Sequence, residues 1–269
     1  MPENGEEKKM KKFLVLIVFA MIIIFALSCG NEKKSSGYEL ALITDVGTID
    51  DRSFNQGSWE GLKKYAEEKG ITHKYYQPTE KTTDAYIDSI DLAVAAGAKI
   101  VVTPGFLFEP AIYKAQDIHP EVNFVLLDGS PQDGNYQDFR IEKNVYSVFY
   151  AEEEAGFLAG YGAVKEGYTN LGFMGGMAVP AVVKFGYGFV QGVNYAAKEF
   201  GIKNVKVDYN YLGGFNPSPE IQTKAASWYR NGVQVIFVAG GGAGNSVMSA
   251  AEQNNGYVIG VDVDQSSES

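Results

Sequence analysis

The sequence has few of the side chains from which metal and covalent sites are built. Cys29 is its only cysteine, which excludes a disulfide within one chain and a zinc site made of several cysteines. Its two histidines, His73 and His119, are too few for a histidine-rich metal site. These absences predict a protein with no metal site and no cofactor.

Basic residues are also scarce. The chain has 23 Lys and Arg against 33 Asp and Glu, which gives a formal net charge of −10. Residues 1–28 contain four lysines and three glutamates, so the remaining residues carry a formal charge of −11. Proteins bind nucleic acid largely by neutralising its phosphates with Lys and Arg. The charge balance therefore argues against a nucleic-acid partner.

Familiar catalytic motifs are missing too. The sequence contains no P-loop, no Gly-x-Ser-x-Gly elbow and no zinc-binding His-Glu helix motif. The glycine clusters at 186–188 and 240–244 do not complete Gly-x-Gly-x-x-Gly. Because neither a well-placed histidine nor a reactive cysteine is available, we predict a binding protein without catalytic residues rather than an enzyme.

The N-terminus carries the one long apolar run, residues 13–27, which follows Lys11 and Lys12 and is closed by small residues. This order is typical of a secretory signal peptide. Its 15 residues fall short of the roughly 20 that span a bilayer, which disfavours the alternative of a transmembrane anchor. Cys29, followed by a polar stretch, resembles a lipobox, which implies cleavage before Cys29 and acylation of its sulfur, as by palmitate.

From this pattern we predict a signal peptide at 1–28 and a lipidated tether at 29–37. The mature protein is then expected to be exported and held at the cell membrane by its lipid, in the periplasm or on the outer surface.

After the tether, strand-like and helix-like segments alternate. Strands are predicted at 38–44, 73–77, 99–103, 122–127, 170–174, 205–212, 233–238 and 257–261. Helices are predicted at 53–69, 83–96, 110–118, 151–165, 183–200, 220–230 and 246–253, and 140–148 is interpreted as an extended crossover. Repeated βα units predict parallel sheets with helices on both faces. We therefore expect an α/β fold of two doubly wound, Rossmann-like lobes, with a ligand cleft between them.

The lobes are predicted at 38–145 and 146–262, and 263–269 is expected to begin a return crossover. In the first helix, Ser53 and Gln56 have the spacing of a capping box, which places Ser53 at the N-cap. The expected buried stripe of this helix consists of Trp59, Leu62, Tyr65 and Ala66. Phe54 lies about a quarter turn from that stripe and is expected in the cleft instead.

Ligands of open α/β sheets bind outside the carboxyl ends of the strands. Here those ends carry carboxylates and glycines, which suit a closely fitting polar ligand: Asp45, Asp128, Asp262, 175–176, 213–214 and 240–242. Carboxylates at these places can accept hydrogen bonds from ligand hydroxyls or ring N–H groups. Capping of a turn is the alternative for each of them.

Two aromatic residues are expected in the same cleft. Phe54 follows the predicted N-cap, and Phe215 lies in a Gly-Gly-Phe-Asn-Pro turn. If the two rings stack on both faces of a flat ligand, each contact is worth roughly 1–3 kcal/mol, by the magnitudes known for nucleic-acid bases. The alternative is that each ring only packs against its local neighbours. Asn55 adds a side-chain amide. The predicted ligand-binding residues are thus Asp45, Phe54, Asn55, Asp128, Phe215, Gly241 and Asp262.

Four segments of the chain resemble the basic membrane protein family of bacterial lipoproteins: 50–56, 154–161, 185–189 and 260–265. The characterised members of this family include purine nucleoside receptors of ABC transporters. The resemblance implies a type I periplasmic-binding-protein fold, in which two lobes close on a ligand. It also implies that Phe54 and Phe215 stack on the purine, that Asp45 and Asp128 contact base or ribose, and that Asp262 holds the ribose hydroxyls or the base edge.

The sequence departs from the family pattern at two places. Pro217 stands where the family usually has an acid, two residues after the second phenylalanine. Family members also continue for several tens of residues beyond the position of Ser269 and carry there a lysine that contacts ribose. The resemblance therefore implies that this chain is truncated.

The sequence favours a lipid-anchored receptor that captures purine nucleosides such as inosine, guanosine or adenosine for the permease of an ABC importer. We expect this receptor to be a monomer. Two alternatives remain open: a surface adhesin or antigen that binds host proteins, and a sugar receptor of the same fold.

Overall fold

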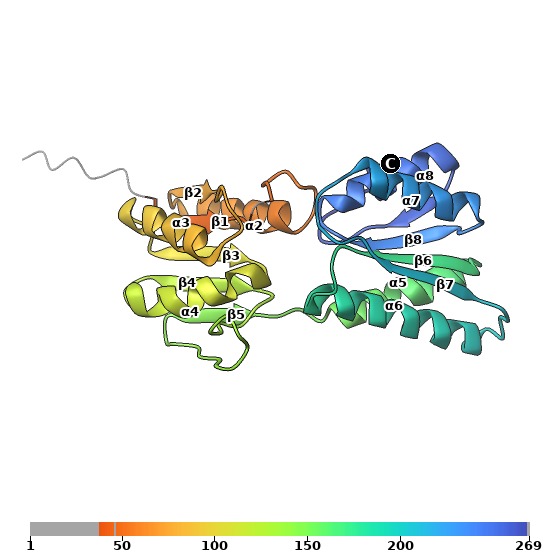
Figure 1. Cartoon of the computed structure of the whole chain (residues 1–269), viewed down its shortest axis with the longest axis horizontal. Helices are drawn as coiled ribbons and strands as arrows, with labels where there is room; N and C mark the ends of the chain where they lie inside the picture. The colour runs from red at the N-terminus through yellow and green to blue at the C-terminus, as the bar shows by residue number, and fades with distance from the viewer. Residues whose placement is uncertain (1–37, 46, 268–269) are drawn as a thin grey trace, which may run out of the picture. The chain divides into compact units, whose positions relative to one another are not determined.

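The computed structural model describes residues 38–45 and 47–267. Tyr38–Ser269 forms one compact unit that contains two parallel sheets flanked by helices (Figure 1). The predicted signal peptide, the tether and Cys29 lie outside the described residues. None of the helices within the described part is long and apolar enough to cross a membrane.

The first lobe is built on a five-stranded sheet of order β2-β1-β3-β4-β5, with all neighbours parallel. Its strands are β1 (Leu40–Ile43), β2 (His73–Tyr76), β3 (Ile100–Pro104), β4 (Asn123–Leu127) and β5 (Val145–Val148). Its helices are α2 (Phe54–Lys69), α3 (Thr83–Ala95), the short 3-10 helix η1 (Phe106–Phe108) and α4 (Glu109–Ile118).

The second lobe is built on a four-stranded parallel sheet of order β7-β6-β8-β9. Its strands are β6 (Asn170–Gly175), β7 (Lys206–Tyr211), β8 (Val235–Ala239) and β9 (Tyr257–Ile259). Its helices are α5 (Glu152–Lys165), α6 (Pro180–Glu199), α7 (Pro219–Arg230) and α8 (Ala243–Asn254). In both sheets the strand order reverses beside the first strand, which is the doubly wound arrangement predicted from the sequence.

The alternation of residues in β1 divides the first lobe into two cores. Ala41 and Ile43 belong to the core that α3 and α4 cover, whereas Leu40 and Leu42 face α2. Beside α2, the second face of the sheet borders a hollow of about 660 Å³. The apolar strand residues that line this hollow are Leu40, Ile100, Val102, Val125 and Leu127.

The predicted buried stripe of α2 is only half right. Leu62 and Ala66 are buried, but Tyr65 is 48% exposed, because it borders the hollow beside α2 instead of packing against the sheet. Trp59 is half-buried and makes ring contacts with His73 and Tyr75 at centroid distances of 5.4 Å.

The second lobe is packed on both faces of its sheet. One face forms a core with α7 and α8, and the other forms an aromatic core with α5 and α6 that includes Phe173, Phe189 and Phe237. Helices α5 and α6 approach each other closely at glycines. A Cβ atom at Gly160 would lie 2.2 Å from the carbonyl oxygen of Phe189, and one at Gly192 would lie 2.0 Å from that of Phe157. These glycines of α5 and α6 are therefore required by helix packing.

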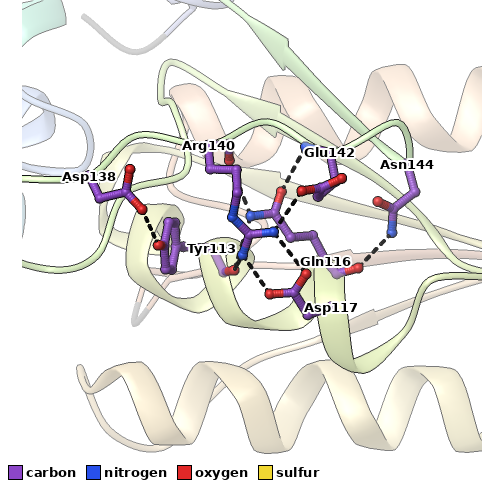
Figure 2. Close-up of polar contacts among 7 residues, drawn as sticks. All are labelled: Tyr113, Gln116, Asp117, Asp138, Arg140, Glu142 and Asn144. Carbon is purple, nitrogen blue, oxygen red and sulfur yellow. Dashed lines mark hydrogen bonds and ion pairs between the residues drawn. The ribbon is translucent and has the colours of Figure 1, made fainter.

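The segment 140–148 differs from its prediction as an extended crossover, because its last four residues form the edge strand β5. A polar network on α4 fixes the long connection that precedes this strand (Figure 2). The Arg140 guanidinium donates to Asp117 at 2.8 Å and to Glu142 at 2.7 Å. The buried Gln116 side chain bonds the backbone of Arg140 and Glu142 at 3.1 and 3.0 Å. β5 continues to Val148, past the lobe boundary that we predicted at residue 145.

Candidate functional site

A cavity of about 620 Å³ is lined by the loops that follow the carboxyl ends of strands in both sheets. All seven residues predicted to bind a ligand line this cavity: Asp45, Phe54, Asn55, Asp128, Phe215, Gly241 and Asp262. Parallel strands of a doubly wound sheet direct their carboxyl ends to one edge, and this topology explains why residues so distant in sequence come together.

The start of α2 is capped by Asp51. One carboxylate oxygen of Asp51 accepts from the backbone N–H of Ser53 at 2.9 Å and of Gln56 at 3.0 Å, and the other accepts from that of Asn55 at 3.2 Å. Ser53 is at the N-cap as predicted, but its side chain makes no capping bond. Gln56 accepts from the N–H of Arg52, so the predicted capping box does not form.

Asn55 joins two carboxylates. Its Nδ2 donates to Asp45 Oδ1 at 3.1 Å and to Asp51 Oδ2 at 3.2 Å, and Asp45 Oδ1 also accepts from the N–H of Gly47 at 2.6 Å. Asn55 is only 7% exposed, and its Oδ1 is buried without a hydrogen-bond partner. Burial raises the pKa of Asp51, and the bonds from Gln56, Ser53 and Asn55 oppose that rise.

Asp128 follows β4 in a left-handed backbone conformation, with φ of 53°. Burial and the neighbouring carboxyl groups of Glu152 and Asp262 raise its pKa to about 7, against a smaller opposing effect of Lys184. Glu152 is itself buried and pairs with Lys184 at 3.0 Å. Asp128 Oδ1 is buried and has no hydrogen-bond partner.

Asp262 follows β9 and reaches the start of α2, where it accepts a hydrogen bond from the Ser53 hydroxyl. Although the residue is exposed to the cavity, the protein atoms around its carboxyl raise its pKa to about 6. The hydrogen bond from Ser53 lowers this pKa, and the charges of Asp51 and Glu152 raise it further. Gln265 donates to the carbonyl of Arg52 and accepts from the N–H of Val261 at 3.0 Å. The loop after β9 is therefore bound to the first lobe at two points.

Glycines position Phe215 on the second-lobe side of the cavity. A Cβ atom at Gly176 would lie 2.5 Å from the Phe215 ring, and Gly241 has a φ of 55° with its backbone against the same phenylalanine. The carbonyl of Phe215 accepts from the N–H of Ala243 at 2.8 Å. The structure thus gives Gly241 a clear steric role beside Phe215.

Sequence reasoning missed several residues of the cavity and its supports. Asp51 and Ser53 lie in the segment that carried the family resemblance, but their partners depend on the fold. Phe106 and Phe185 also line the cavity, and neither follows a strand directly. Within the described residues no group of three or more His, Cys, Asp or Glu side chains is placed to hold a metal ion.

Comparison with known proteins places the chain among transport receptors. The model of the family described as "Bmp: ABC transporter substrate-binding protein PnrA-like" matches residues 38–269. The ABC transporter nucleoside-binding protein BmpA of Lactococcus lactis subsp. cremoris is 33% identical over 246 residues, which are 87% of this chain and 66% of that protein. Basic membrane protein A1 of Borrelia garinii subsp. bavariensis is 30% identical over 96% of this chain and 73% of its own length.

A solved structure supports the fold. A solute-binding protein of an ABC transporter system from Aeropyrum pernix K1 superposes with a TM-score of 0.67 at 25% identity, over 82% of this chain and 60% of that chain. The predicted type I periplasmic-binding-protein fold of two doubly wound lobes is therefore confirmed. The chain spans 66% of the Lactococcus relative and 60% of the Aeropyrum chain.

Proposed function

This chain belongs to the Bmp family of PnrA-like ABC transporter substrate-binding proteins, and on that basis we propose that it is a receptor for purine nucleosides. It captures the nucleoside in the cavity between its lobes and presents it to the permease of an ABC importer. The observation that carries the proposal is the convergence of Phe54 and Phe215 with the three carboxylates of Asp45, Asp128 and Asp262 in one cavity.

The chemistry of the cavity suits a flat ring joined to a polyol. A volume of about 620 Å³ lies within the usual range of small-molecule sites. Phe54 and Phe215 supply aromatic faces for a base, and carboxylates accept hydrogen bonds from ribose hydroxyls and ring N–H groups.

The charge of the cavity favours a neutral ligand. Its polar lining includes the acids Asp45, Asp50, Asp51, Asp128 and Asp262, against Lys81. A phosphate group would be repelled by this excess of carboxylates. We therefore propose the nucleoside, and not its phosphorylated form, as the ligand.

The receptor is proposed to act at the outer face of the cell membrane, anchored through Cys29 after removal of residues 1–28. It works as a monomer without a cofactor and catalyses no reaction. Closure of the two lobes around the nucleoside is the change that the permease recognises. The name of the Lactococcus relative as a nucleoside-binding protein supports the ligand class.

Thermal melting of residues 30–269, the exported chain without the lipidated Cys29, tests the proposal. We expect inosine, guanosine and adenosine to raise the melting temperature, because a ligand that binds only the folded state stabilises it by mass action. Uridine, ribose and guanosine monophosphate are the comparison ligands. A shift with ribose alone would instead indicate a sugar receptor, and a cooperative melt that no ligand shifts would overturn the proposal in favour of the adhesin alternative.

A further inference from the structure

Glu152 is a buried carboxylate at the point where the chain passes from the first lobe to the second. It is the first residue of α5 and follows the connection 149–151, and it is only 4% exposed. A buried carboxylate needs a partner, and Lys184 of α6 provides one at 3.0 Å. The Lys184 ammonium also donates to the carbonyl of Tyr150 at 3.2 Å. Glu152 is therefore fixed on the second lobe, beside the connection.

The carboxyl group of Glu152 meets that of Asp128, which belongs to the first lobe. Asp128 follows β4, and the two carboxyl groups are close enough to share a hydrogen bond. Both residues also border the hollow beside α2. Two carboxylates in contact repel each other when both are ionised, and they attract when a proton lies between them. The force between the lobes at this carboxyl pair, Asp128 and Glu152, therefore depends on whether the pair holds a proton.

Other ionisable groups surround the carboxyl pair without neutralising it. They are Tyr150 before α5, Lys184 on α6 and Asp262 after β9, with Asp45 after β1, Asp51 before α2 and Glu109 on α4 bordering the same region. Lys184 is the single cation in this set, and it already pairs with Glu152. Burial and the carboxyl groups of Glu152 and Asp262 raise the pKa of Asp128 to about 7, which supports a proton held by the pair near neutral pH.

We propose that this carboxyl pair couples capture of the nucleoside to the uptake of one proton from solvent. When the pair holds a proton, it stabilises the arrangement in which both lobes enclose the ligand. When both groups are ionised, their repulsion favours separation of the lobes. The receptor therefore binds more tightly in mildly acidic than in mildly alkaline medium.

Glu152 lines the hollow beside α2 and is not among the residues that line the ligand cavity. It is therefore a positioning residue, which acts on the ligand through Asp128 and through the contact between the lobes. This inference rests on the proposed function, because it takes a nucleoside to be the ligand that the lobes enclose.

Calorimetric titration of residues 30–269 with inosine, guanosine and adenosine tests the inference. Each titration is made in phosphate and in Tris, because the difference in heat between buffers of different ionisation enthalpy gives the number of protons exchanged. We expect uptake of about half a proton per bound nucleoside near pH 7, and an affinity about fivefold higher at about pH 6 than at about pH 8. The nucleosides themselves stay largely neutral over this range.

Variants of the second-lobe partners identify the pair as the source of the proton effect. Glu152→Gln removes the like charge and leaves Lys184 beside Asp128, so it should abolish proton uptake and bring the affinities at the two pH values to within about twofold of each other. Lys184→Gln removes the cation instead and should move the pH dependence to higher pH. Glu154→Gln removes the same charge at an exposed position two residues along α5 and should behave as the wild type.

The outcomes distinguish this inference from the proposed function. If the wild-type chain binds a nucleoside with no proton uptake, or with release of a proton, the inference is wrong while the nucleoside receptor stands. The same conclusion follows if Glu152→Gln and Lys184→Gln both retain the wild-type pH dependence. If the wild-type chain binds no nucleoside at any pH, the proposed function fails and the inference fails with it.

Discussion

The two lobes line one cavity with different chemistry. The first lobe contributes the polar side chains of Asp45 and Asn55, which are hydrogen-bonded to each other, and that of Asp128. The second contributes Phe215 and Asp262 together with the glycine turns at 213–214 and 240–242. Side chains with defined donors and acceptors discriminate between ligands, whereas close-packed backbone mainly sets the shape of a site. The comparison therefore predicts that most of the selectivity resides in the first lobe and that the second lobe mainly sets the fit.

The lobes also differ in how they are packed. Both faces of the second sheet carry a large core, and α5 and α6 meet at glycines. In the first lobe the face toward α2 has a small core of four buried residues and borders the apolar hollow of about 660 Å³. Substitutions in the second lobe should therefore have the larger effects on stability.

The largest expected effect is that of Gly192→Ala. The added Cβ would lie 2.0 Å from the Phe157 carbonyl oxygen, and overpacking of this kind costs about 3 kcal/mol of unfolding free energy. Gly162→Ala in α5 is the control, because nothing lies within 4 Å of its Cβ and alanine favours a helix by about 0.5–1 kcal/mol. Urea unfolding measures both, and equal stabilities would contradict the close packing of α5 and α6.

Loss of either ring that we propose to stack on the base should weaken nucleoside binding. Phe54→Ala and Phe215→Ala are each expected to reduce the binding free energy by roughly 1–3 kcal/mol. Phe54→Ala should change the melting temperature little, because its ring is half-buried, whereas Phe215→Ala should also lower it, because that ring packs against the core of the second lobe. Tyr65→Ala, an exposed aromatic residue on the same helix α2 as Phe54, is the control and should bind normally. Calorimetry provides the affinities, and an unchanged affinity for Phe54→Ala would exclude stacking at that ring.

Much of the fold could be predicted because it depends on local patterns. Each of the eight strands and seven helices expected from the sequence is present in the described residues. One further strand, β5, was not predicted. It lies in a connection rich in polar residues and is held by the tertiary contacts of Arg140, Gln116 and Asn144. Tyr65 fits the helical period of its neighbours, but its exposure depends on what packs beside α2.

The positions of the site residues followed from topology, whereas their partners did not. Strand ends converge in a doubly wound sheet, so Asp45, Asp128 and Asp262 were found from sequence alone. The Ser53 hydroxyl was expected to cap α2, but its partner is Asp262, 209 residues away. The Asp51 carboxylate caps the helix instead, by accepting hydrogen bonds from the backbone N–H groups at its start. No local pattern distinguishes these two arrangements, because both satisfy the same backbone N–H groups.

Ser53→Ala tests the contact between the loop after β9 and the first lobe. The variant removes a hydrogen bond to a carboxylate at the rim of the cavity, and we expect a loss of about 1 kcal/mol in unfolding free energy. Because the Ser53 bond lowers the pKa of Asp262, that pKa should rise, as followed by NMR titration of the carboxyl carbon. Ser58→Ala removes only a bond to the Phe54 carbonyl within α2 and should leave the Asp262 titration unchanged.

The smallest expected effect is the pH dependence of the ligand-free chain. The folded pKa values of Asp128, about 7, and Asp262, about 6, lie above the ordinary value of 3.8, so the folded state binds these protons more tightly than the unfolded state. Their contribution to stability therefore falls as the pH rises from about 4 through these folded values. We expect the melting temperature to increase when the pH is lowered from about 8 to about 5.

Asp128→Asn should raise the melting temperature at the higher pH and reduce the gain on acidification, because it removes the charge that Glu152 and Asp262 repel. Glu154→Gln, an exposed carboxyl of α5, should leave the pH profile unchanged. A wild-type melting temperature that falls on acidification would contradict the carboxyl cluster that Asp128 of the first lobe forms with Glu152 and Asp262 of the second.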